Sequence, residues 1–210
     1  MTATIDASIS TPAKSFSEII QEMREHHLTA LVTPKTQARK VKAYNLAQHS
    51  VPHTSQLGDD EQQQVKELMG DDICKFQAST TGFASNTQQG VNGASRDYLA
   101  SDKGEKAQSS FKLKMEEQRN AALKASQDTI NAAFDKAQEL GEKHPQLQNG
   151  ILSVTGTIVS GITEAAKFIS DIVVKAVGVV IDALAKAWEW IQEQFSTAAK
   201  SIGNFFASIF

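Results

Sequence analysis

The chain has little of the chemistry on which most enzymes and disulfide-stabilised proteins depend. Its 210 residues include one cysteine, Cys74, which excludes an intrachain disulfide framework and a zinc site built from cysteines. Four prolines exclude a proline-rich chain. The GxSxG, HExxH, GxGxxG and P-loop motifs are also missing. We therefore expect no enzyme, no catalytic residue, no cofactor and no metal site.

Two isolated features could carry chemistry, but each has a plainer interpretation. His49 and His53 have the spacing of a metal-ligand pair on a helix, yet Pro52 between them favours a loop. We expect these histidines to be solvated. Cys74 follows Ile73, and we expect it to be a small buried apolar residue rather than a nucleophile.

Large apolar residues are scarce in the first two-thirds of the chain and dense in the last third. Leu, Ile, Val and Phe make up 26 of residues 1–149, or 17%, and 23 of residues 150–210, or 38%. Chains below about 20% have difficulty in burying a core. We therefore expect the first region to need the second for its core.

The charge balance and the first residues bear on partners and location. A net charge of −3, without basic stretches among aromatic residues, gives no expectation of nucleic-acid binding. The segment MTATIDASISTPAKSFSEII lacks a basic stretch followed by an apolar one, so we expect no cleaved signal peptide. Its composition resembles the leaders of proteins exported by bacterial injection machines. An ordinary frayed terminus is the alternative.

Residues 1–76 have the pattern of short helices. Residues 15–31 carry apolar side chains at helical spacing, and Ser15 with Glu18 forms a capping box. The second and third helices are expected at 36–48 and 59–69. We expect Gly70 to end the third helix.

The middle of the chain divides into a polar segment and a helix. Residues 77–110 are rich in Gly, Ser, Thr, Asn and Gln, and we expect a flexible linker that marks a domain boundary. Residues 111–143 are rich in helix-forming residues and have a narrow apolar seam, which predicts an amphipathic helix. Because no segment has the alternation of a strand, the expected fold is an all-α helical bundle.

The most informative segment is 151–210, an apolar helical region with one charged stripe. From Glu164 to Asn204 the polar positions recur every 3.64 residues, close to the 3.6 residues of an α-helical turn. We expect one long helix, or two collinear helices joined near Gly178. The charged stripe consists of Glu164, Lys167, Asp171, Lys175, Asp182, Lys186, Glu189, Glu193 and Lys200.

A surface helix normally has an apolar stripe on a polar cylinder, and here the proportions are inverted. The helix could be the centre of a bundle, lie in a membrane, or be covered by a partner or by copies of itself. In a membrane, charges persist only where they face water, protein or each other, as they would around a pore. Aromatic residues could serve as interfacial anchors or as core residues. These residues are Trp188, Trp190, Phe205, Phe206 and Phe210.

The pattern of 151–210 resembles that of proteins that hide an apolar amphipathic helix until they meet a membrane, such as secreted α-helical pore-forming toxins and the translocators of bacterial injection machines. This resemblance implies a secreted, toxin-like or effector-like protein that inserts at a target cell membrane. It also implies a homo-oligomer on the membrane, with a second subunit left open. The alternative is a non-enzymatic interaction protein in which the C-terminal helix is a permanent core or binds a partner helix.

Overall fold

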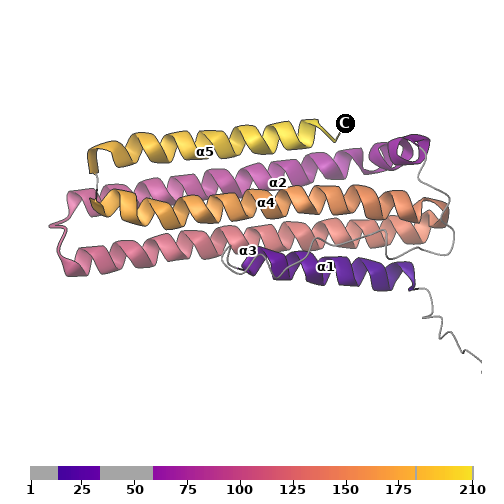
Figure 1. Cartoon of the computed structure of the whole chain (residues 1–210), viewed down its shortest axis with the longest axis horizontal. Coiled ribbons are helices and arrows are strands. Elements are labelled where there is room, and N and C mark those ends of the chain that lie inside the picture. Colours follow the sequence, from indigo (N-terminus) through magenta and orange to yellow (C-terminus); the bar gives the residue numbers. More distant parts are fainter. Residues whose placement is uncertain (1–13, 34–58, 183, 210) are drawn as a thin grey trace, which may run out of the picture.

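The computed structural model describes residues 14–33, 59–182 and 184–209. In this part of the chain the fold is an elongated bundle of five α-helices with no strand, which confirms the all-α prediction (Figure 1). A short 3-10 turn, η3 (Pro145–Leu147), precedes the fourth helix. The helices are α1 (Phe16–Val32), α2 (Asp59–Ala100), α3 (Glu105–Lys143), α4 (Gln148–Asp182) and α5 (Leu184–Ala207).

The three longest helices form the centre of the bundle, with α2 and α4 running in one direction and α3 running in the other (Figure 1). α5 packs against α2 and α4, and α1 packs against α3 and α4 along only one half of the bundle. α4 therefore contacts all four other helices, because each of them buries an apolar face against it.

α1 forms as the sequence predicts. The Glu18 amide donates to Ser15 Oγ at 3.3 Å, and the Ser15 amide donates to Glu18 Oε2 at 2.7 Å, which completes the capping box. The bond from the Ser15 backbone holds the pKa of the Glu18 carboxyl below its usual 4.5. The helix expected at 36–48 lies outside the described residues.

The prediction of a flexible linker at 77–110 is wrong for most of that segment. Residues 77–100 are the second half of α2, a helix of 42 residues, and Gly70 lies inside it instead of ending it. The connection between α2 and α3 is short, at residues 101–104, where the Gly104 amide donates to Asp102 Oδ1 at 3.0 Å. α3 then includes the helix expected at 111–143.

Tertiary packing explains why this polar segment is helical. The hydroxyls of Thr80 and Thr87 donate to the carbonyls of Phe76 and Phe83, both at 2.7 Å, so they do not compete with the helix for backbone groups. Gly90 allows α3 to come close, because a Cβ there would lie 1.8 Å from Oε1 of Gln118. Buried positions also recur every three or four residues, at Val65, Met69, Ile73, Phe76, Thr80, Phe83, Thr87, Val91, Ala94 and Tyr98.

The C-terminal region is a hairpin of two antiparallel helices, which corrects the single or collinear helix expected from the sequence. The break is at residue 183 rather than at Gly178, and α5 runs back along α4 (Figure 1). A continuous helix of about 60 residues would extend roughly 90 Å, and the apolar face of its second half would lie in water. Folding back buries that face against α2 and α4.

Candidate functional site

The α4–α5 hairpin contains most of the residues that the sequence singled out. Its inward side chains include some of the most completely buried ones in the bundle, such as Ile151, Ile158 and Phe206. Its outward side carries the charged stripe. The hairpin therefore has a strongly apolar inner face and a narrow polar outer face, as the periodicity predicts.

The charged stripe faces outward on both helices. Glu164, Lys175 and Glu189 are exposed, and Lys167 and Asp171 are half-buried. Of the stripe's later members, Glu193 and Lys200 on α5 are exposed as well. The backbones of Asp182 and Lys186 are helical, but their side chains lie outside the described part of the structure.

The end of the hairpin exposes apolar surface. Val174 of α4 is 57% exposed, the largest exposure of any large apolar side chain that we describe on the hairpin. Val177, Val179 and Ile181 are half-buried around it. These residues lie in the last turns of α4, at one end of the elongated bundle.

The two tryptophans lie at the same end. Trp188 and Trp190 are both half-buried near the start of α5. The guanidinium of Arg96 on α2 lies 5.1 Å from the centre of the Trp188 ring, a cation–π contact that holds this end of α5 against α2. Partly exposed indoles beside an apolar helix end are typical of residues at a membrane interface.

The other predicted anchors belong to the core in this conformation. Phe206 is fully buried, and the half-buried ring of Phe205 lies over Gly161, 2.1 Å from where a Cβ of that residue would be. The remaining anchor, Phe210, lies outside the described residues. Of the two roles left open for these aromatics, the folded bundle uses Phe205 and Phe206 for packing.

Amide side chains hold the middle of α5 to α2. Gln88 Nε2 donates to Gln192 Oε1 at 2.9 Å, and Gln192 Nε2 donates to Asn92 Oδ1 at 3.3 Å. All three groups are partly exposed to water, so each bond contributes only about 1 kcal/mol. The sequence analysis missed this contact, because it placed Gln88 and Asn92 in a linker.

Ion pairs join the first three helices to one another. Arg24 of α1 pairs with Asp135 of α3 at 2.6 Å, and Lys114 of α3 pairs with Asp97 of α2 at 2.6 Å. These contacts tie α1, α2 and α3 into a frame by charge as well as by apolar packing.

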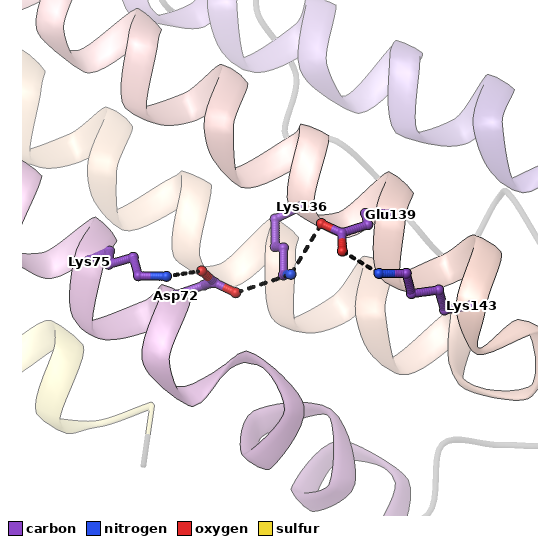
Figure 2. A network of polar contacts seen from close by, with 5 residues as sticks. All are labelled: Asp72, Lys75, Lys136, Glu139 and Lys143. Carbon is purple, nitrogen blue, oxygen red and sulfur yellow. Dashed lines mark hydrogen bonds and ion pairs between the residues drawn. The ribbon is translucent and has the colours of Figure 1, made fainter.

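A larger network strengthens the frame between α2 and α3 (Figure 2). Asp72 accepts from Lys75 at 2.9 Å and pairs with Lys136 at 3.5 Å, and Glu139 contacts both Lys136 at 3.1 Å and Lys143 at 2.6 Å. The bond with Glu139 raises the pKa of Lys136, and the bond from Lys143 lowers the pKa of Glu139. Lys136 and Glu139 are therefore both charged at neutral pH.

A groove of about 480 Å³ separates α1 from α5 above the polar face of α4. His26 and His27 form part of one wall, Phe205 part of the other, and Glu164 one end of the floor. His27 is 8% exposed, and its ring lies 6.1 Å from that of Phe134 on α3. Burial lowers the pKa of His27 to about 4, so this side chain is neutral at physiological pH.

The isolated features with possible chemistry do not assemble into a site in the described residues. Cys74 is exposed, which corrects the expectation that it is buried, because it lies on the outward side of α2. No group of three or more metal-ligating side chains occurs in the part of the chain that the structure describes. His49 and His53 lie outside it.

Among the described residues, no helix combines the length and the apolar character that crossing a membrane requires. Comparisons with protein-family models, with curated proteins and with solved structures found no match to this chain.

Proposed function

We propose that this chain is a membrane-active, toxin-like or effector-like protein that acts on a target cell through its α4–α5 hairpin. The observation that carries the proposal is the apolar end of the hairpin, where Val174 is 57% exposed and Trp188 and Trp190 are half-buried. This end would contact the lipid interface first. The hairpin would then leave the frame formed by α1, α2 and α3, and enter the bilayer.

Some hydroxyls of the hairpin donate within their own helix, which supports this movement. Thr163 donates to the carbonyl of Val159 at 2.8 Å, and Thr197 donates to that of Glu193 at 2.9 Å. Each of these two hydroxyls therefore keeps its partner when its helix moves as a unit. Helices that enter lipid need such internal satisfaction, because the hydrocarbon offers no hydrogen bonds. By contrast, Ser170 accepts from Arg119 of α3 at 2.8 Å, and the buried hydroxyl of Thr155 has no hydrogen-bond partner among the described residues.

The charged stripe favours an oligomer of the chain on the membrane. Glu164, Lys167, Asp171 and Lys175 lie on one side of α4 and alternate in sign. Charges at membrane depth need water or other charges beside them. Several hairpins with their stripes turned toward one another would meet that need, and the stripes would line a polar passage.

The interaction-protein alternative also has an observation in its favour. α4 contacts all four other helices, and its inward residues, such as Ile158 and Ile169, are completely buried. A helix with these contacts can serve as the permanent core of a bundle. The absence of a membrane-spanning candidate among the described helices is consistent with this second function.

A reversible lock on α5 separates the two functions. In a Cys74→Ser background, Gln88→Cys and Gln192→Cys would be joined by a short bis-maleimide that contains a cleavable disulfide. The two native side chains are hydrogen-bonded at 2.9 Å, so the linker can bridge them without moving the helices. Release of an entrapped dye from phosphatidylcholine vesicles, with and without phosphatidylserine, is then measured.

The matched control locks α2 to α3 instead, with Asp97→Cys and Lys114→Cys, whose native side chains are 2.6 Å apart. We expect the unlocked protein and the α2–α3 lock to release dye, and the α2–α5 lock to release none until the linker is reduced. Release that is unchanged by the α2–α5 lock would contradict movement of the hairpin. No release from the unlocked protein at any concentration would favour the interaction-protein function.

A further inference from the structure

The outward face of α4 has a charge order that is complementary to itself. Glu164, Lys167, Asp171 and Lys175 read negative, positive, negative, positive along the helix. At 100° per residue these four positions lie within an arc of about 80°, so they share one face. An antiparallel copy of this face, centred between residues 169 and 170, brings each charge opposite one of the other sign.

The same face is covered by α1 along only half of its length. Met23 of α1 lies close to Gly156, with its Cε 3.1 Å from where a Cβ of Gly156 would be. Val174 follows Gly156 by 18 residues, which is five helical turns, and therefore lies on the same side of α4. It is 57% exposed. α1 lies along only one half of the bundle (Figure 1).

α1 ends near the centre of the charge pattern. α1 runs in the same direction as α4. Met23 lies near Gly156, and burial together with the charge of Lys167, which is later in α4, lowers the pKa of His26, which is later in α1. Its last residue, Val32, is nine residues beyond Met23 and is 53% exposed. Nine residues turn the helix by 180°, so Val32 lies on the side of α1 opposite Met23, and of the two exposed valines only Val174 lies beside the face.

We infer that this face is the interface of an antiparallel homodimer of the chain in water. Glu164 lies opposite the partner's Lys175, and Lys167 lies opposite the partner's Asp171, twice over because the interface is two-fold symmetric. The symmetry places both α1 helices on one side, each next to the uncovered half of the other copy's α4. A parallel pairing in the same register would instead oppose like charges.

Charge and apolar contact have different roles in this dimer. The ion pairs are at the surface and select the register, while Val174 supplies apolar area that the monomer leaves in water. Asp171 also has a polar interaction within its own chain, so the partner's lysine adds a second contact to this group. The dimer does not depend on the membrane-active function and stands or falls separately.

Sedimentation velocity of a charge-swap series tests the dimer. The wild-type chain is expected to form a reversible dimer with twice the 22.8 kDa mass of one chain. Glu164→Lys opposes like charges at two symmetric places and should raise the dissociation constant by about tenfold or more. Glu164→Lys combined with Lys175→Glu restores both pairs and should return the constant to near its wild-type value.

Circular dichroism of each variant is the control, because residues 164 and 175 are exposed and neither change should alter the helix content. In a Cys74→Ser background, a chain with Glu164→Cys and a chain with Lys175→Cys should cross-link when mixed, and neither should cross-link alone. A monomer at all concentrations, equal dimerisation of the single and double variants, or cross-linking of each chain alone would overturn the inference.

Discussion

The frame of α1, α2 and α3 and the hairpin of α4 and α5 are held by different forces. α3 has 14 charged residues among 39, whereas α4 and α5 together have nine among 59. Ion pairs such as Arg24–Asp135 and Lys136–Asp72 join the helices of the frame. The hairpin is joined to the frame mainly by apolar packing. Its polar contacts with the frame include the amide bonds at Gln192, the Arg96–Trp188 contact and a hydrogen bond from Arg119 Nε to Ser170 Oγ at 2.8 Å.

This difference matters because lipid can replace one kind of contact and not the other. Hydrocarbon chains pack against Val, Ile and Phe much as a protein core does, but they cannot pair with a carboxylate or an ammonium group. On the proposed function, we therefore expect moving into lipid to cost the hairpin less than it would cost a helix of the frame. The predictions below test whether the two regions are energetically separate.

The largest expected effects come from emptying the core in each region. Phe134→Ala removes a fully buried ring of α3 beneath α1, and Phe206→Ala removes one of α5; each should cost about 3–5 kcal/mol locally. In hydrogen exchange measured by mass spectrometry, Phe134→Ala should raise exchange in α1 and α3. Phe206→Ala should raise it in α5 and leave α3 protected. If Phe206→Ala raised hydrogen exchange equally in the frame and in the hairpin, the two regions would form one cooperative unit.

Acid should weaken the frame at α1. The pKa of His27 is about 4 in the fold and 6.5 when unperturbed, so the unfolded chain binds more protons between these values. The free energy of unfolding is therefore highest above pH 6.5 and falls by about 3 kcal/mol as the pH drops to 4. Burial also lowers the pKa of His26, and this acts in the same direction.

Urea denaturation at pH 7.5 and 4.5 measures this loss, with His27→Leu as the comparison. Glu164 faces the same groove, and Lys167, Arg24 and Asp135 supply the other charges near the histidine pair. Leucine cannot take up a proton, so the variant should lose most of the difference between the two pH values. If the wild-type and variant proteins show the same pH dependence, burial of His27 is not its source.

A smaller effect is expected at the seam between the regions. Gln192→Ala removes both amide contacts to α2 and should destabilise the docking of α5 by about 2 kcal/mol, which would raise exchange in α5 by about tenfold or more. Dye release should become faster at the same protein concentration. Faster exchange without faster release would separate the docking of α5 from membrane activity.

The smallest effect is expected from a single surface ion pair of the frame. Lys114→Ala removes the pair with Asp97, in which both side chains are well exposed, and should cost less than about 1 kcal/mol. The melting temperature followed by circular dichroism should change little. A large drop would mean that charge contributes more to the frame than the exposure of this pair implies.

The sequence predicted the helices that have strong periodicity or clear end signals. The Ser15–Glu18 capping box marked the start of α1, and the charged stripe predicted helix on both sides of residue 183. The stripe residues whose side chains the structure describes are exposed or half-buried, as that pattern implies.

The errors have two physical sources. Residues 77–100 have weak intrinsic helix propensity, and their helix depends on packing against α3 and α5, to which Gly90 and the Thr80 and Thr87 hydroxyls are suited. The fold-back at 183 has no Gly or Pro signal, and the stripe continues across it with helical spacing. The spacing of polar residues predicts that a segment is helical. It does not predict the direction in which the next helix runs.

The intrinsic tryptophan fluorescence of single-tryptophan variants tests the central claim most directly. Trp188 and Trp190 both lie near the start of α5, so Trp190→Phe and Trp188→Phe each leave one reporter at the hairpin end. Emission is recorded with vesicles that carry a brominated lipid as quencher. The account predicts that emission shifts to the blue, that the lipid quenches it, and that the α2–α5 lock prevents both changes. Emission maxima and quenching that stay unchanged when vesicles are added would contradict it, and the hairpin would then be a permanent part of the bundle.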